Sequence, residues 1–276
     1  MTPLPPGFLD RPFAHRGLHD RRGGRPENSL AAAAAAIGGG YGIECDLQLS
    51  RDGVPVVFHD AGLDRLTASS GPTAARTAAE LERLTLLGTS ETIPTLDALL
   101  ALLGGQVPLL LELKDQTGVL GPGEGRLEAA AAQALAGYAG PVAAMSYSPF
   151  MVERMRALAP SLPAGLVTCG FTADDWPAVP AQRREALARI ASFGEVGASF
   201  ISHDRRDLAA PSVARLKAAG VPVCCWTVRS LGEEREARTI ADQITFEGYL
   251  PEPRSDATGA SLRGKAGTVP DAPGGG

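Results

Sequence analysis

The stretch GIECDLQLSRDGVPVVFHD, from Gly42 to Asp60, decides how the fold is interpreted. Two apolar, β-like runs, Gly42–Leu49 and Val54–Phe58, flank Asp52 and Gly53, a dipeptide typical of β-hairpin turns. A connection this short cannot join parallel strands. We therefore interpret Val54–Phe58 as the return arm of a hairpin and not as a strand of the main sheet.

Strand-like and helix-like segments alternate on both sides of this hairpin. The predicted strands are Pro12–His15, Gly42–Leu49, Pro108–Leu113, Val142–Tyr147, Ala164–Thr168, Ser199–His203, Pro222–Val228 and Gln243–Glu247. The predicted helices run from Asn28 or Ser29 through Ala36, and over Thr95–Leu103, Glu124–Tyr138, Phe150–Leu158, Arg183–Phe193, Ser212–Ala219 and Leu231–Ala241. This order favours an α/β fold, a closed TIM (β/α)8 barrel with a β-hairpin excursion after the second strand. An open doubly wound sheet is the alternative, although no G-x-G-x-x-G motif follows the first strand.

The chain divides into three predicted parts. Residues 1–10 form an N-terminal extension, residues 11–250 form the barrel, and residues 251–276 form a disordered tail. The tail contains six glycines, four prolines and no aromatic residue, a composition that buries little apolar surface. The barrel part is close to the size of about 250 residues that is typical of this fold.

Composition excludes several classes of protein. The net charge is −5 and no block of lysines and arginines stands out, so we expect no nucleic-acid partner and no anionic-membrane partner. No apolar run approaches the roughly 20 residues of a membrane span and none resembles a signal peptide, which predicts a cytoplasmic protein. The four cysteines, Cys45, Cys169, Cys224 and Cys225, are interpreted as buried core thiols. No particular oligomeric state is predicted.

Carboxylates are placed together on predicted strands. Glu44 and Asp46 are two residues apart, so both side chains point to one face, where unpaired charges would be costly. A hard cation with oxygen ligands, Mg²⁺ or Ca²⁺, would compensate them; solvation near a strand end or an arginine partner is the alternative. Glu112 repeats the pattern and is a candidate third ligand. Lys114, on the same face as Glu112, would either meet a substrate oxygen or pair with a carboxylate.

Two of the four histidines flank this carboxylate pair. His15 ends the first strand and His59 ends the hairpin arm, which would return it beside Glu44 and Asp46. Cleavage of a phosphodiester needs one group that takes a proton and another that gives one, and histidine suits both tasks near neutral pH. Arg16, next to His15, offers two parallel hydrogen bonds to a phosphate.

The remaining candidates have weaker signals. His19 lies in a polar loop and is interpreted as a surface residue. His203 ends a predicted strand, and a structural role is preferred there over a place on the rim of the site. Trp226, late on another strand, would either wall a substrate pocket or pack in the core.

These residues, in this order, resemble the glycerophosphodiester phosphodiesterase family over about residues 11–250. The matching motifs are His15-Arg16-Gly17, Pro26-Glu27-Asn28-Ser29, Glu44-x-Asp46, Asp52-Gly53, Val56-Val57-x-His59-Asp60, Leu63-x-Arg65-Leu66-Thr67, Ile93-Pro94-Thr95-Leu96, Glu112-x-Lys114 and Trp226-Thr227-Val228.

The resemblance implies a TIM barrel that hydrolyses a small glycerophosphodiester to sn-glycerol 3-phosphate and an alcohol, with a divalent metal, Mg²⁺ or Ca²⁺. The roles it implies are acid and base for His15 and His59, metal ligands for Glu44, Asp46 and Glu112, substrate contacts for Arg16, Lys114 and Trp226, and support of these groups for Glu27, Asn28 and Asp60.

Two positions depart from the pattern of the family. Arg229 follows Trp-Thr-Val where members often have Asn, and the final strand ends in Thr-Phe-Glu247-Gly where members often have Thr-Asp-x-Pro. We expect both to affect the choice of substrate more than the reaction. The alternatives are a lysophospholipase D-like or phosphoinositide-type enzyme that acts on lipids, and a catalytically silent barrel that binds phosphodiesters. The silent barrel is disfavoured because every acid/base and metal position is present.

Overall fold

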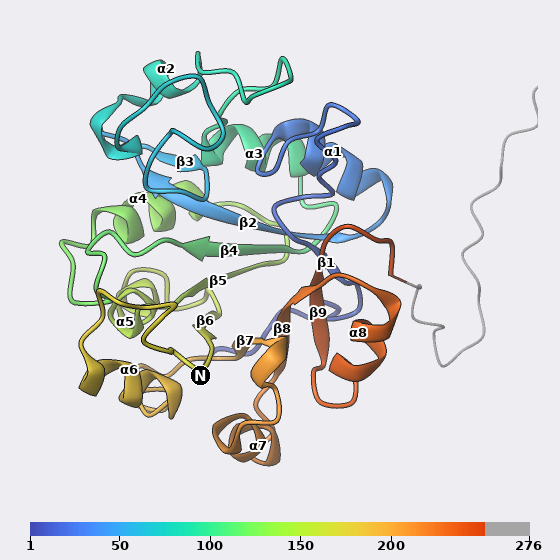
Figure 1. Cartoon of the computed structure of the whole chain (residues 1–276), viewed down its shortest axis with the longest axis vertical. Coiled ribbons are helices and arrows are strands. Elements are labelled where there is room, and N and C mark those ends of the chain that lie inside the picture. The colour runs from blue at the N-terminus through green and yellow to red at the C-terminus, as the bar shows by residue number, and fades with distance from the viewer. Residues whose placement is uncertain (252–276) are drawn as a thin grey trace, which may run out of the picture.

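The computed structural model describes residues 1–251, and the predicted tail lies outside them from residue 252 onward. Eight parallel strands in this part of the chain form a closed barrel, because the first strand pairs with both the second and the last (Figure 1). In barrel order they are β1 (Phe13–Ala14), β2 (Gly42–Leu49), β4 (Leu109–Leu113), β5 (Val142–Ser146), β6 (Ala164–Thr168), β7 (Ile201–Asp204), β8 (Val223–Val228) and β9 (Gln243–Phe246). The predicted TIM barrel is confirmed, and the open doubly wound sheet is excluded.

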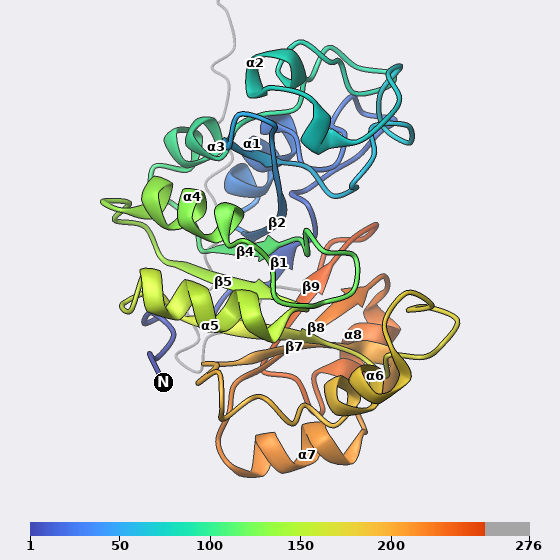
Figure 2. The same ribbon diagram turned by 90° about the vertical axis from the view of Figure 1, so that its left-hand side faces the viewer.

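The predicted hairpin is also confirmed. β3 (Pro55–Val57) pairs antiparallel with β2, with Leu47 opposite Val57. Residues 58–95, which we call the excursion, then leave the barrel before the chain returns to it. They contain a 3₁₀ turn, η1 (Thr73–Ala75), and the short helix α2 (Ala78–Leu81), which was not predicted. In Figures 1 and 2 the excursion projects from one side of the barrel, and its small apolar core includes Phe58 and Leu81.

Helices cover the outside of the barrel (Figure 2). They are α1 (Leu30–Gly38), α3 (Leu96–Leu103), α4 (Arg126–Leu135), α5 (Pro149–Leu158), α6 (Ala181–Ala188), α7 (Pro211–Ala218), α8 (Leu231–Ala237) and the 3₁₀ turn η2 (Arg205–Asp207). The helix predicted over Arg183–Phe193 ends earlier, at Ala188, because Ile190 has φ of 50° and cannot continue it. The hydroxyl of Ser29, one of the two predicted starts of this helix, caps α1 by accepting from the backbone N–H of Ala32.

One end of the barrel interior is filled by aromatic side chains. Phe8 and Phe13 are buried, and their ring centroids lie 5.2 Å apart. The side-chain amide of Gln243, at the start of β9, donates to the carbonyl of Leu9. The first ten residues, expected as an extension, therefore cover the end of the barrel where the strands begin. This leaves the opposite end, where the strands finish, open for a site.

Two further expectations concern the rest of the described chain. All four cysteines are buried and free, which confirms their interpretation as core thiols. Among residues 1–251, none of the helices has the length and apolar character needed to cross a membrane.

Candidate active site

Three carboxylates meet inside the open end of the barrel. Glu44 and Asp46 lie on one face of β2, and Glu112 lies opposite Asp46 on β4. All three are buried, and one carboxylate oxygen from each lies within 4.8 Å of the others. The structure thus brings together the three residues predicted to hold a metal, through the alternation of side chains along strands.

Positive charges compensate only part of this cluster. The Lys114 ammonium lies 2.7 Å from Asp46 Oδ1 and 2.6 Å from Glu112 Oε1, and Arg16 Nε lies 3.4 Å from Asp46 Oδ2. Burial disfavours the charge of Asp46, but Lys114 and other cations nearby bring its pKa below the ordinary value. Burial and the charge of Asp46 instead hold the pKa of Glu44 well above its ordinary value. Lys114 therefore pairs with carboxylates, which is one of the two roles predicted for it.

The donor set fits a hard divalent cation. Burial raises the pKa of Glu112 as it does that of Glu44. Glu44 and Glu112 therefore lack enough neighbouring positive charge when no ion is bound. Oxygen ligands of this kind suit Mg²⁺ or Ca²⁺ and not a soft metal. A divalent ion among Glu44, Asp46 and Glu112 would supply the missing charge.

Two unusual backbone conformations position Arg16 and Asn28. Both have φ of 56°, a left-handed backbone conformation that residues other than glycine rarely adopt. The Arg16 N–H donates to Glu44 Oε2 over 3.0 Å, and Asn28 Nδ2 donates to Asp46 Oδ2 over 2.8 Å. Gly17, at φ of 78°, completes the turn, because a Cβ there would come within 2.9 Å of Ala32 on α1. The turn after β1 therefore orients Glu44, and the residue before the cap of α1 orients Asp46.

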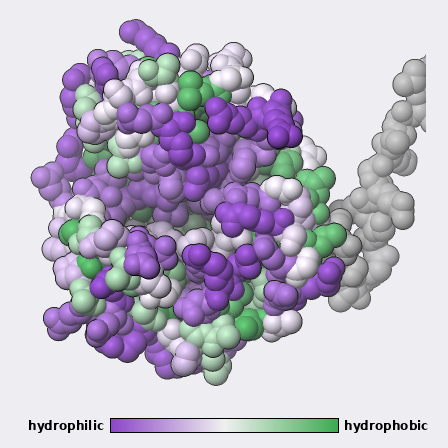
Figure 3. All heavy atoms as spheres, in the orientation of Figure 1, coloured by the Kyte–Doolittle hydropathy of each residue, from purple (hydrophilic) through white to green (hydrophobic). Residues whose placement is uncertain are grey.

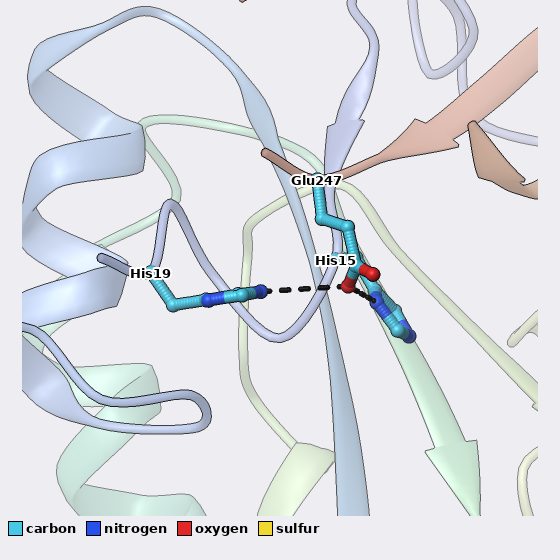
Figure 4. Close-up of side chains that lie close together, drawn as sticks. All are labelled: His15, His19 and Glu247. Carbon is cyan, nitrogen blue, oxygen red and sulfur yellow. Dashed lines mark hydrogen bonds and ion pairs between the residues drawn. The ribbon is translucent and has the colours of Figure 1, made fainter. Parts of the chain in front are cut away.

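His15 is held from behind by a carboxylate that the sequence analysis did not place at the site. Its Nδ1 lies 2.6 Å from Glu247 Oε2, on the residue that follows β9 (Figure 4). His15 Nε2 faces the metal cluster, 4.0 Å from Glu44 Oε2. Burial lowers the pKa of His15, while the bond to Glu247 opposes that shift. The departure of this chain at Glu247 was expected to concern substrate choice, but it directly contacts the candidate acid/base residue.

His59 is arranged in the same way. Its Nδ1 lies 2.6 Å from Oδ1 of Asp60, and its ring lines the cavity shared with His15. Burial, reinforced by the charge of Lys114, lowers the pKa of His59 to about 4. A carboxylate that accepts from Nδ1 fixes the tautomer in which Nε2 carries the free lone pair. Both histidines can therefore exchange a proton through Nε2.

These groups line one cavity of about 190 Å³. Its polar wall is formed by the carboxylates, histidines, Arg16 and Lys114, and its other wall by Met145, Tyr147, Val167 and Trp226. Trp226 thus walls the pocket, one of its two predicted places, and its indole N–H donates to the carbonyl of Ser202 over 3.0 Å. Hydrophilic residues surround a hollow near the middle of the face in Figure 3.

Three residues with weak sequence signals are now placed. His203 is fully buried, its Nδ1 2.7 Å from the hydroxyl of Thr168, so it is structural and does not reach the rim. His19, interpreted as a surface residue, instead lies 3.5 Å from Glu247 Oε2 with its side chain 26% exposed (Figure 4). Arg229 lines the cavity and pairs with Glu247 Oε1 over 2.7 Å.

Glu27 supports Arg16 from the side away from the metal cluster. Its Oε1 accepts from Arg16 over 2.6 Å. Hydrogen bonds from Arg65 and the charge of Arg16 lower the pKa of Glu27 to about 2, against the opposing effect of burial. Glu27, Asn28 and Asp60 therefore each contact one of the residues they were predicted to support.

Comparisons with known proteins agree with this geometry. Residues 15–245 match the model of the "Glycerophosphoryl diester phosphodiesterase family". The chain is 29% identical over 227 residues to YhdW of Bacillus subtilis (strain 168), which carries the name of a glycerophosphodiester phosphodiesterase; the match covers 79% of this chain and 86% of YhdW.

Solved structures give the same result. A phosphodiesterase of Oleispira antarctica, solved in complex with the product sn-glycerol-3-phosphate, is 25% identical with a TM-score of 0.70, over 88% of this chain and 93% of that one. A protein of Silicibacter pomeroyi DSS-3, named as a glycerophosphoryl diester phosphodiesterase, is 25% identical with a TM-score of 0.70, over 86% and 89% of the two chains.

Proposed function

Because the chain belongs to the glycerophosphoryl diester phosphodiesterase family and is a phosphoric diester hydrolase, we propose that it hydrolyses glycerophosphodiesters to sn-glycerol 3-phosphate and an alcohol, with a divalent metal and two histidines. The observation that carries the proposal is the cavity onto which three buried carboxylates, two anchored histidines and two cations converge. The sn-glycerol-3-phosphate complex of the Oleispira antarctica enzyme supports the identity of the product.

The substrate binds with its phosphate among the charged residues. Arg16 and Lys114 offer donors to the nonbridging oxygens, and a guanidinium can bind a phosphate through two parallel bonds. The aromatic and apolar wall at Tyr147 and Trp226 receives the glycerol moiety. The alcohol then points to the mouth, where the Arg229 side chain is 56% exposed.

Glu44, Asp46 and Glu112 would hold the divalent ion, Mg²⁺ or Ca²⁺. The ion, when bound, supplies a Lewis acid that neutralises a phosphoryl oxygen and favours attack at phosphorus. Asn28 and the Arg16 N–H fix two of these carboxylates through the hydrogen bonds described above, so little reorganisation is needed when the ion enters.

The two histidines move the protons. One accepts a proton at Nε2 from the oxygen that attacks phosphorus, and the other donates a proton from Nε2 to the alkoxide as its bond to phosphorus breaks. The attacking oxygen belongs to water, or to a glycerol hydroxyl whose cyclic phosphate is then opened by water. Glu247 and Asp60 keep each ring in the required orientation and stabilise its protonated form. The negative phosphate raises the pKa of both histidines when substrate binds, which offsets the effect of their burial.

Identification of the products tests the proposal. Purified enzyme with Mg²⁺ is incubated with glycerophosphocholine, and the products are separated by chromatography. We expect sn-glycerol 3-phosphate and choline in equal amounts. Release of phosphocholine and glycerol would place the scissile bond on the other side of the phosphate, and the absence of any product with several glycerophosphodiesters would contradict the activity. The cytoplasmic location stays a prediction from the sequence.

A further inference from the structure

Arg65, on the excursion, donates four hydrogen bonds to two carboxylates at the edge of the site. Its Nε and one terminal nitrogen lie 2.6 and 3.0 Å from the oxygens of Asp60. Its two terminal nitrogens each lie 2.8 Å from an oxygen of Glu27. Both edges of the planar guanidinium are thus used, and Arg65 is absent from the cavity lining.

The two carboxylates serve different parts of the site. Asp60 accepts from Nδ1 of His59 over 2.6 Å, and Glu27 accepts from Arg16 over 2.6 Å. A continuous series of side-chain hydrogen bonds therefore runs from His59 through Asp60, Arg65 and Glu27 to Arg16. Each of these contacts is a charge-assisted hydrogen bond in the short range that such bonds favour.

Without the central guanidinium this arrangement would not persist. Glu27 and Asp60 are both negatively charged, and one terminal nitrogen of Arg65, Nη2, donates to both of them and holds them close together. Removal of the positive charge would leave two neighbouring carboxylates that repel each other and turn towards solvent. A lysine cannot replace the planar fork, because its ammonium is a single point charge.

We propose that Arg65 is a positioning residue that sets the orientation of His59 and Arg16 together. In this proposal the part of the excursion that carries Arg65 serves to bring its guanidinium between Glu27 and Asp60. The inference rests on the proposed function, in which His59 transfers a proton and Arg16 binds the phosphate. It predicts two separable effects: one on kcat through Asp60 and His59, and one on KM through Glu27 and Arg16.

Kinetics of Arg65→Gln with glycerophosphocholine and saturating Mg²⁺ test the proposal. We expect kcat/KM to fall about 10- to 100-fold, the loss that a small misplacement of reacting groups causes, with contributions from both kcat and KM. Arg65→Lys keeps the positive charge and serves as the test if Arg65→Gln does not fold. It should have only part of the wild-type activity. Arg83→Gln is the matched control, an exposed arginine of the excursion with no ion pair in the described residues.

Double variants separate this role from a merely structural one. In an Asp60→Asn background, Arg65→Gln should raise KM but cause no further loss of kcat. In a Glu27→Gln background, it should lower kcat but cause no further rise in KM. A loss of folded enzyme would instead lower the apparent kcat by the same factor in every background and leave KM unchanged, and thermal unfolding of each variant shows whether that occurs.

Several results would overturn the inference. One is a kcat/KM of Arg65→Gln or Arg65→Lys within twofold of the wild-type value. Another is a set of changes in kcat and KM in both double variants that equals the sum of the changes in the single variants. His59→Ala is measured beside them. If His59→Ala is inactive and the double variants are additive, the role of Arg65 fails alone. If His59→Ala keeps full turnover, the proposed function fails and the role of Arg65 fails with it.

Discussion

Replacement of Glu247 by glutamine tests the orientation of His15. The two oxygens of Glu247 have different partners: Oε2 accepts from His15 Nδ1 over 2.6 Å, and Oε1 accepts from Arg229 over 2.7 Å. A glutamine has the same shape but only one oxygen. If that oxygen faces His15, the amide N–H₂ meets the guanidinium, and two donors then face each other. If it faces Arg229, the N–H₂ meets Nδ1 of His15 and forces the proton onto Nε2, the wrong tautomer for a base.

The expected loss follows from the bond that is weakened. A hydrogen bond to a charged group contributes about 1.5–3 kcal/mol, which corresponds to about 10- to 100-fold in rate when it acts in the transition state. We therefore expect Glu247→Gln to lower kcat by about 10- to 100-fold, with little change in KM, because Glu247 contacts neither the predicted metal ligands nor Lys114 among the described hydrogen bonds.

The assay is the initial rate of sn-glycerol 3-phosphate release from glycerophosphocholine at saturating Mg²⁺. Arg229→Gln is the matched variant, because it removes the other partner of Glu247 and leaves the bond to His15 in place. Its kcat should fall less than that of Glu247→Gln. A Glu247→Gln enzyme with kcat within twofold of wild type, or an Arg229→Gln enzyme with the larger loss of kcat, would refute the reasoning.

Three further predictions concern the histidines, the pH dependence of stability and the substrate. His15→Ala and His59→Ala should each lower turnover by about 10²- to 10⁴-fold, the span of positioned acid/base groups. His19→Ala should change turnover by less than about fivefold, because the contact of His19 with Glu247 is a long one. Near-normal turnover of His15→Ala or His59→Ala would remove that residue from the mechanism. The pKa of Glu27 is lowered from 4.5 to about 2 in the fold, so its stabilising contribution is complete above pH 4.5 and is lost as the pH falls towards 2. The free energy of unfolding, measured with urea, should therefore fall across this range by on the order of 1–2 kcal/mol more in wild type than in Glu27→Gln. Parallel curves of unfolding free energy against pH for the two proteins would contradict the ion pairs assigned to Glu27. Values of kcat/KM for glycerophosphodiesters of choline, ethanolamine and glycerol should differ by less than about 10³-fold, or roughly 4 kcal/mol, because the alcohol points to the open mouth, and a larger spread would indicate a dedicated head-group pocket at Arg229.

The parts of the site that the sequence predicted are those set by local periodicity. Glu44 and Asp46 fall on one face because side chains alternate along a strand, and Asp52-Gly53 marks the turn of the hairpin, where Gly53 has φ of 84° and adopts a conformation that favours glycine. The barrel follows from the count of strands that remain once the hairpin arm is set aside. None of these inferences needs a contact between distant parts of the chain.

The parts that were missed depend on contacts between distant residues. Glu247 and His15 are 232 positions apart, and they meet only because β9 pairs with β1 to close the barrel. Arg65 was matched as part of a motif, but its partner Glu27 is 38 positions away, on the loop before α1. The barrel closure that the strand count predicts does bring the last strand beside the first. The position of Glu247 directly after β9 was therefore a signal that could have placed it near His15.

The central claim, a metal held by three buried carboxylates, is tested most directly by removal of the metal. Enzyme dialysed against EDTA is assayed for sn-glycerol 3-phosphate release from glycerophosphocholine, before and after addition of Mg²⁺ or Ca²⁺. We predict a loss of about 10²-fold or more, in line with the several kcal/mol that a Lewis acid contributes. The added ion should restore activity in wild type, but not in Glu44→Gln or Asp46→Asn. Full activity of the dialysed enzyme in excess EDTA would contradict the account.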